Sequence, residues 1–196
     1  MSGDRPVTAP GAVGADARRD RRAFVVHVHR MRRAPGATLD VSVHGEVPDL
    51  AVAGVAVPDG AEVSLVGALA SYPGGIEVTG TVRAPWRAAC RRCGADAAGT
   101  VDVEIRERCV PGGPASGDED AYDLDDELDL EPVVRDAVLL ALPIAPLCRE
   151  DCAGLCPWCG TDHNVASCDC LPPADPRWSA LDVLAGPGGE DPPARA

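Results

Sequence analysis

Lysine, aromatic residues and long hydrophobic runs are scarce in this sequence. All 18 basic residues are arginines, and aromatic residues make up 3% of the 196 residues. The core must therefore be built from Val, Leu, Ala and Ile, whose burial contributes about 1–3 kcal/mol per side chain. We expect modest stability that is assisted by metal.

The absent features also exclude several functions. The longest apolar stretch, residues 137–144, is too short to cross a bilayer, and the N-terminus lacks the apolar run of a signal peptide. These features predict a cytoplasmic protein with no membrane partner. No Ser-His-Asp arrangement, glycine-rich phosphate loop or carboxylate pair stands out, so we expect no enzymatic activity and no small-molecule substrate.

The net charge of −13 argues against a chain that coats nucleic acid nonspecifically, because such binding neutralises many phosphates. Local basic patches remain compatible with this charge.

Composition divides the chain into four segments. Residues 1–22, rich in Ala, Gly, Asp and Arg, predict a disordered arm. Residues 23–147 predict a β-rich domain, and 148–171 a Cys-rich zinc-binding segment. Residues 172–196 predict a short helix over 175–184 and a disordered tail. The expected fold class is α+β, an antiparallel β-rich domain with a docked helix and zinc knuckles.

Alternating apolar residues and turn signals place the strands of the β-rich domain. Strands are predicted over residues 24–29, 39–44, 50–57, 62–69, 76–86 and 100–105. A Pro-Gly-Gly turn marks a hairpin between the fourth and fifth of these. The Cys90–Cys93 turn then follows, so the first cysteine pair is predicted at a hairpin tip.

An acidic run and a helix follow the sheet. Residues 111–131 combine Pro, Gly and Ser with nine acidic residues and are interpreted as a solvated loop. A helix is predicted over about 131–142, with Pro132 in its first turn, an apolar face and a stop at Pro143. We expect this helix to dock on the sheet.

Nine cysteines are many for a reducing compartment, where clustered pairs are more often metal ligands than disulfides. Two cysteines in a tight turn aim both sulfur atoms at one tetrahedral ion. Cys109 remains as a buried thiol in a strand-like segment. The eight candidate ligands, for one or two Zn²⁺ ions, are Cys90, Cys93, Cys148, Cys152, Cys156, Cys159, Cys168 and Cys170.

Two partitions of these ligands are open. In the preferred one, the first four form one site and the last four a local, ribbon-like second site. In the other, Cys148, Cys152, Cys156 and Cys159 hold one ion with His163 as a spare ligand. Without metal, a Cys-x-x-Cys pair is also compatible with a thiol oxidoreductase, although such a dithiol normally opens a helix after a strand.

Arg87, Arg91 and Arg92, together with Trp86, form the candidate RNA-binding site, since arginines hold phosphates and a ring stacks on bases. An equally compatible interpretation is that the exposed arginines serve solubility and that the Trp side chain packs over its own zinc-binding turn. Further candidate contacts are Trp158 and the patch of Arg30, Arg32 and Arg33.

The chain resembles the YceD family of large ribosomal RNA subunit accumulation proteins, in the form found in high-GC Gram-positive bacteria, over roughly residues 24–185. The motifs that carry the resemblance are Arg32-Arg-Ala-Pro-Gly36, Val78-Thr-Gly-Thr-Val82 leading into Cys90-Arg-Arg-Cys93, Asp129-Leu-Glu-Pro132 with Arg135-Asp136, Leu142-Pro143 through Pro146-Leu-Cys148, Asp151-Cys-Ala-Gly-Leu-Cys-Pro-Trp-Cys-Gly160 and Asp175-Pro-Arg-Trp178. The Cys168-Asp-Cys170 ending departs from the His-containing ends of relatives.

The resemblance implies a ribosome biogenesis factor that supports accumulation or processing of 23S rRNA. Members are not known to be enzymes, and some lack the later cysteines. Cys90 and Cys93 would then carry the common function, and the later cluster would be a lineage-specific stabiliser. The expected partner is large-subunit rRNA or a large-subunit ribosomal protein. The alternative is an adaptor or chaperone that holds a basic ribosomal protein through acidic residues 118–131.

Overall fold

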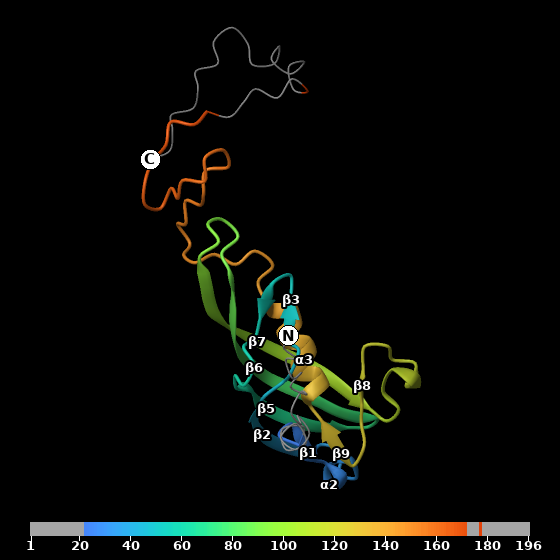
Figure 1. Ribbon diagram of the computed structural model, residues 1–196. Coiled ribbons are helices and arrows are strands. Elements are labelled where there is room, and N and C mark those ends of the chain that lie inside the picture. Colours follow the sequence, from blue (N-terminus) through green and yellow to red (C-terminus); the bar gives the residue numbers. More distant parts are fainter. Residues whose placement is uncertain (1–21, 172–176, 178–196) are drawn as a thin grey trace, which may run out of the picture. The chain divides into compact units, whose positions relative to one another are not determined.

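The computed structural model describes residues 22–171 and Arg177 (Figure 1). These residues belong to two compact units, whose boundary lies between Cys152 and Ala153. The first unit therefore ends five residues later than the β-rich domain expected from the sequence. The expected N-terminal arm and C-terminal helix with its tail lie outside the described residues, apart from Arg22 and Arg177. No helix in the described part is long and apolar enough to cross a bilayer.

The first unit is an antiparallel β-sheet domain with one docked helix, as the sequence predicted. Its elements are β1 (Val25–His27), α2 (His29–Arg32), β2 (Thr38–Gly45), β3 (Ala51–Val52), β4 (Val55–Ala56), β5 (Val63–Tyr72), β6 (Gly75–Ala89), β7 (Asp96–Val110), the 3₁₀ turn η1 (Gly113–Ser116), β8 (Tyr122–Asp123), β9 (Glu127–Asp129) and α3 (Glu131–Ala141). The main sheet has the order β2-β5-β6-β4-β3, with β7 against β6, while β1 and β9 form a separate pair.

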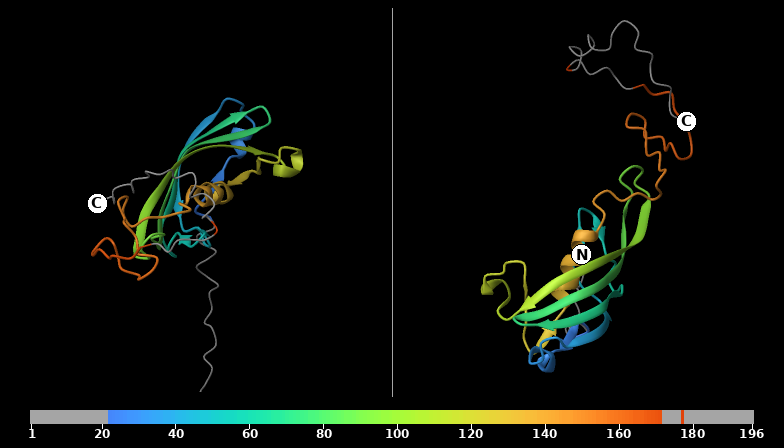
Figure 2. Two further views of the ribbon diagram at one scale, coloured as in Figure 1. Left: turned by 90° about the horizontal axis from the view of Figure 1, so that it is seen from above. Right: turned by 180° about the vertical axis from the view of Figure 1, so that it is seen from behind.

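The β6–β7 hairpin is the longest element of the sheet, with 15 residues in each strand. On β6, pairing with β5 ends at Arg83, and the short strand β4 pairs with Arg87 and Ala88. The strand β7 pairs with β6 from Ile76 to Ala89. The hairpin thus continues past β5 to a tip that carries Cys90 and Cys93 (Figures 1 and 2).

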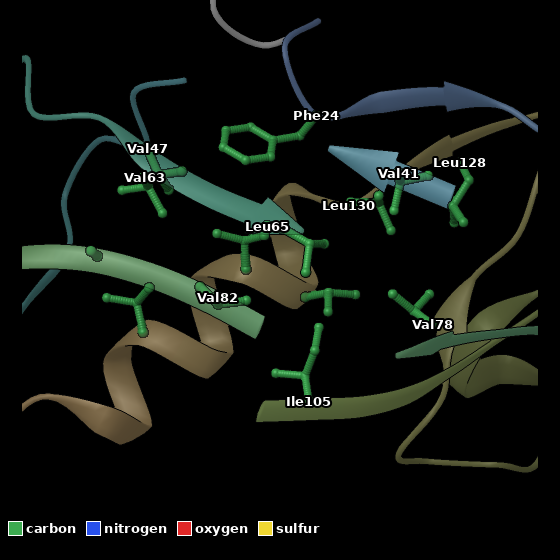
Figure 3. Close-up of a cluster of buried hydrophobic side chains, with 14 of the residues drawn as sticks. Phe24, Val41, Val47, Val63, Leu65, Val78, Val82, Ile105, Leu128 and Leu130 are labelled. Atoms are coloured by element: carbon green, nitrogen blue, oxygen red, sulfur yellow. The ribbon is translucent and has the colours of Figure 1, made fainter. Parts of the chain in front are cut away.

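Alternation along the strands builds the core on one face of the sheet. On β6, Val78 and Val82 are fully buried, whereas Arg83 lies exposed on the other face. The helix α3 packs on β6 and β7 and buries Val134 and Val138. Figure 3 shows this aliphatic core, with the single phenylalanine of the chain, Phe24, at its side.

Two local expectations differ from the structure. The strand expected over 24–29 ends at His27, because the chain turns into the short helix α2 at His29. The strand expected over 50–57 is instead a small hairpin of two-residue strands. Its turn residues Ala53 and Gly54 have φ of 51° and 82°, as a tight hairpin turn requires.

The acidic segment 111–131 is also more ordered than a solvated loop. The strand β8 pairs in parallel with the end of β7, and β9 pairs with β1. Between the acidic residues, Leu124, Leu128 and Leu130 are buried in the core. The acidic side chains therefore lie on a segment that apolar residues anchor to the domain.

Candidate functional site

The tip of the β6–β7 hairpin is a closed turn. The N–H of Cys90 donates to the carbonyl of Ala95 (2.7 Å), and the N–H of Gly94 donates to the carbonyl of Cys90 (2.9 Å). Gly94 has φ of +75°, a left-handed conformation that glycine adopts without strain. This turn holds Cys90 and Cys93 on one ligand-bearing loop.

The segment that follows α3 passes over this tip and contributes the second cysteine pair. Arg91 N–H donates to the carbonyl of Pro146 (2.9 Å), and the Arg92 guanidinium donates through Nη1 to the carbonyl of Cys152 (2.7 Å). Leu147 and Trp86 pack against the small core around Cys90 and Cys152. These contacts join the hairpin tip to the exit of the helix.

The sulfur atoms of Cys90, Cys93, Cys148 and Cys152 form the first cluster. All four lie within 4.8 Å of one another. Sγ–Sγ distances are 3.8 Å between Cys90 and Cys152 and 3.6 Å between Cys93 and Cys148. Four Zn–S bonds of about 2.3 Å in a tetrahedron give sulfur separations of about 3.8 Å, whereas a disulfide needs about 2.05 Å. The first cluster therefore has the geometry of a metal site.

The second cluster lies in the second compact unit and consists of Cys156, Cys159, Cys168 and Cys170. It begins on a turn of the same type as the Cys90–Cys93 turn. Cys156 N–H donates to the carbonyl of Thr161 (2.8 Å), and Gly160 N–H donates to the carbonyl of Cys156 (2.9 Å). Its four sulfur atoms also lie within 4.8 Å of one another. In the described part of this unit, the β-pairing is a single bridge between Leu155 and Asp162.

One thiol of each turn is shifted toward the thiolate, the form that binds metal. Hydrogen bonding from the backbone of Cys148 is the main cause that lowers the pKa of Cys90 to about 6. Hydrogen bonding with the side chain and backbone of Thr161 lowers the pKa of Cys159 to about 6.

The structure groups the cysteines as in the first of the two partitions. His163 is exposed and belongs to neither cluster. All nine cysteines are free of disulfides. The ninth, Cys109, is fully buried in the main core, and burial raises its pKa to about 12. It therefore behaves as the buried thiol that the sequence predicted.

The predicted RNA-binding residues have different environments at the tip. Arg87 and Arg91 are exposed, and within the described residues neither side chain has an ion pair or hydrogen bond. Arg92 is instead engaged with Cys152. Trp86 is partly buried over Gly99, where an added Cβ would lie 2.8 Å from the indole ring. No sequence signal indicated the hydrogen bond that the Arg92 guanidinium donates, because the acceptor is a backbone carbonyl 60 residues away.

The predicted arginine patch of Arg30, Arg32 and Arg33 does not join the tip. Within the first unit, α2 lies at the opposite end of the sheet from the β6–β7 turn (Figure 1), so Arg30 and Arg33 are remote from it. Arg32 pairs with Asp126 at 2.8 Å. Trp158, in the second unit, is 51% exposed.

Neither Cys-x-x-Cys turn opens a helix among the described residues. A redox dithiol at a helix start is therefore not the arrangement found here. Both clusters are sets of four cysteines that could hold metal ions.

Comparison with known proteins places this geometry in a family. The family model "Large ribosomal RNA subunit accumulation protein YceD" matches residues 78–185, which include most of β6 and both clusters. The chain belongs to this family. Uncharacterised proteins of Mycobacterium tuberculosis and Mycobacterium bovis are 35% identical to the chain over 172 residues, 84% of this chain and 82% of theirs. An uncharacterised protein of Mycobacterium leprae is 35% identical over 170 residues, 82% of this chain and 77% of its own.

No solved structure matches the chain. The family is linked to accumulation of large ribosomal subunit RNA.

Proposed function

We propose that this protein is a non-catalytic ribosome biogenesis factor that contacts 23S rRNA through the metal-stabilised tip of the β6–β7 hairpin. The observation that carries the proposal is the pair of exposed arginines beside the first cluster, Arg87 and Arg91, whose side chains have no partner among the described residues. Membership of a family linked to large-subunit rRNA supports it.

The proposed metal is Zn²⁺, one ion in each cluster. Zinc accepts four thiolates in a tetrahedron without a redox change, and structural zinc sites are closed in this way. Zn²⁺ with four thiolates carries a charge of −2, so the Arg92 guanidinium beside Cys152 also compensates charge at the first site. The zinc would hold the tip in one conformation before RNA arrives.

Charge distribution limits the RNA contact to a small surface. The net charge of −13 repels phosphates from most of the molecule. At the tip, Arg87 lies opposite the small residue Ala98 in the β6–β7 register, so its guanidinium stays accessible. Arg91 extends from the turn itself, and its backbone is fixed by Pro146. Two such arginines provide phosphate contacts, which position the protein on the RNA but do not read its sequence.

Binding of purified zinc-loaded protein to 23S rRNA fragments tests this surface. We expect Arg87→Glu with Arg91→Glu to weaken binding, and the slope of log affinity against log salt to fall by about 0.7–0.9 per lost contact. The matched control is Arg30→Glu with Arg33→Glu, which makes the same charge change at exposed residues at the other end of the sheet. Equal weakening by both variants would mean that only net charge matters, and the tip would then have no special role.

An adaptor for a basic ribosomal protein is the second candidate, and one observation favours it. A pocket of about 630 Å³ lies beside β8, and its lining includes the carboxylates of Glu107, Glu119, Asp120, Asp123, Asp129 and Asp136. Glu119→Gln with Asp120→Asn should then weaken binding of a basic large-subunit protein and leave RNA binding unchanged. An unchanged affinity for such proteins would remove this candidate.

A further inference from the structure

The outer edge of β7 is open over most of its length. On one side β7 pairs with β6 from Asp96 to Cys109, and on the other side only Cys109 and Val110 pair, with β8. Within the described residues, 96–108 therefore present unpaired backbone groups at the margin of the sheet (Figure 2). Such an edge is a template for another strand.

The charges along this edge are complementary to themselves. Exposed side chains alternate along the solvent face of β7 in the order Asp102, Glu104, Arg106 and Arg108. Three of them form ion pairs inside the chain, Asp102 with Arg83, Arg106 with Glu77 and Arg108 with Asp118. A carboxylate has two acceptor oxygens and a guanidinium five N–H donors, so each can contact a second partner across the edge. In antiparallel pairing about a two-fold axis at Ile105, Asp102 faces Arg108 of a second copy and Glu104 faces its Arg106. All four cross-copy pairs then join opposite charges, which stabilises neighbouring strands.

The length of the open edge fits this register. Pairing centred on Ile105 extends from Asp102 to Arg108, and β8 occupies the edge from Cys109 onward. The other margin of the sheet, β2, has a single acidic residue, Asp40, and no arginine. It therefore lacks charges that would pair with themselves.

A groove of about 250 Å³ lies beside the same stretch of edge. Its lining combines the apolar residues Val103, Ile105, Ala137 and Leu140 with the carboxylates of Glu104, Glu107 and Asp136. Leu140, on α3, is 88% exposed, although it is a large aliphatic residue. A strand added at the β7 edge would cover this groove and remove apolar surface from water.

We propose that the protein forms a two-fold symmetric homodimer by antiparallel pairing of β7 over residues 102–108. The interface is isologous, so each copy contributes the same edge and the same Leu140. The main sheets of the two copies form one continuous sheet, and the two hairpin tips point to its opposite ends. This proposal does not depend on metal identity or on RNA binding.

Sedimentation velocity of the full-length protein over a dilution series tests the dimer through a charge exchange. Arg106→Glu with Arg108→Glu makes the four solvent-face positions 102, 104, 106 and 108 all acidic, and Asp102→Arg with Glu104→Arg makes them all basic. We expect each variant alone to be monomeric at concentrations where the unchanged protein is dimeric. Mixed one to one, they should form a heterodimer, because every facing pair again joins opposite charges. A monomeric unchanged protein throughout the series, or dimers in both separate variants, would overturn the proposal.

Leu140→Asp provides an independent test that does not change the strand. Because Leu140 is exposed, this variant should fold and lose the dimer. The matched control is Val66→Asp, which places the same charge at a 57% exposed residue of the inner strand β5 and should leave the dimer intact. A dimer that survives Leu140→Asp, or that Val66→Asp disrupts equally, would contradict this interface.

Discussion

The two cysteine clusters are each built on a turn of the same type, but they differ in how the rest of the chain supports them. The first joins ligands 62 residues apart, Cys90 and Cys152, on a hairpin and a helix exit that hydrogen bonds already hold together. The second draws all its ligands from residues 156–170. The first metal would therefore reinforce a folded domain, whereas the second would replace a hydrophobic core that its segment lacks.

Metal removal should separate the two regions most strongly. After chelation we expect amide protection to be lost over residues 154–170, because in the described part of this unit no regular sheet or helix holds them. Protection in β5 and β6 should persist, since their core is aliphatic. Hydrogen exchange with mass spectrometry measures both. Retained protection over 154–170 without metal would contradict the comparison.

Double cysteine substitutions should then sharpen the comparison between the two clusters. Cys90→Ser with Cys93→Ser and Cys156→Ser with Cys159→Ser should each lower the zinc content from two ions to one, as measured by elemental analysis. Only the first pair should destabilise the β-sheet domain. A cross-link over a loop of this length contributes about 2–4 kcal/mol, which corresponds to a fall in Tm of roughly 4–16 °C. Equal falls in Tm for both pairs would show that the clusters are equally coupled to the domain.

Arg92→Ala tests the contact that distinguishes the first cluster. Loss of a hydrogen bond from a charged group costs about 1.5–3 kcal/mol, so zinc should leave the first site about ten times faster or more. Release from the second site should not change. Arg91→Ala is the matched control, because its side chain has no described partner while its backbone bond to Pro146 remains. Competition with a coloured chelator measures both rates.

Cys109 provides the smallest expected effect on metal. Because Cys109 is fully buried in the main core, an alkylating reagent cannot reach its thiol in the folded protein. Alkylation of folded, metal-depleted protein should modify the exposed cluster cysteines Cys148, Cys159 and Cys170 and spare Cys109, as peptide mass mapping would show. Cys109→Ala should leave zinc content unchanged. Loss of zinc in that variant would mean that the core residue supports a site.

Much of this arrangement was accessible from sequence because the signals are local. Alternation from Val78 onward predicted the hairpin, and the position of Cys90 and Cys93 placed them at its tip. Pro132 and Pro143 bracketed the helix, which the structure gives as Glu131–Ala141. Each of these signals depends on neighbouring residues alone.

The missed features depend on contacts between distant residues. Leu128 and Leu130 alternate with acidic residues, which is a weak strand signal, and the many acidic residues around them favoured a loop interpretation. The strand β9 forms because β1 lies beside it. The structure groups Cys148 and Cys152 with the first pair, as in the preferred partition, although spacing alone left the alternative open. Spacing could not have revealed that the Arg92 guanidinium donates to the Cys152 carbonyl.

The ratio of large- to small-subunit rRNA tests the central claim most directly. It would be measured in depleted cells that express either the unchanged protein, Arg87→Glu with Arg91→Glu, or Arg30→Glu with Arg33→Glu at equal levels. The account predicts that the tip variant fails to restore large-subunit rRNA, whereas the control variant restores it. Full rescue by the tip variant would contradict an RNA contact at the hairpin tip, and an unchanged ratio on depletion would contradict the proposed role in large-subunit rRNA.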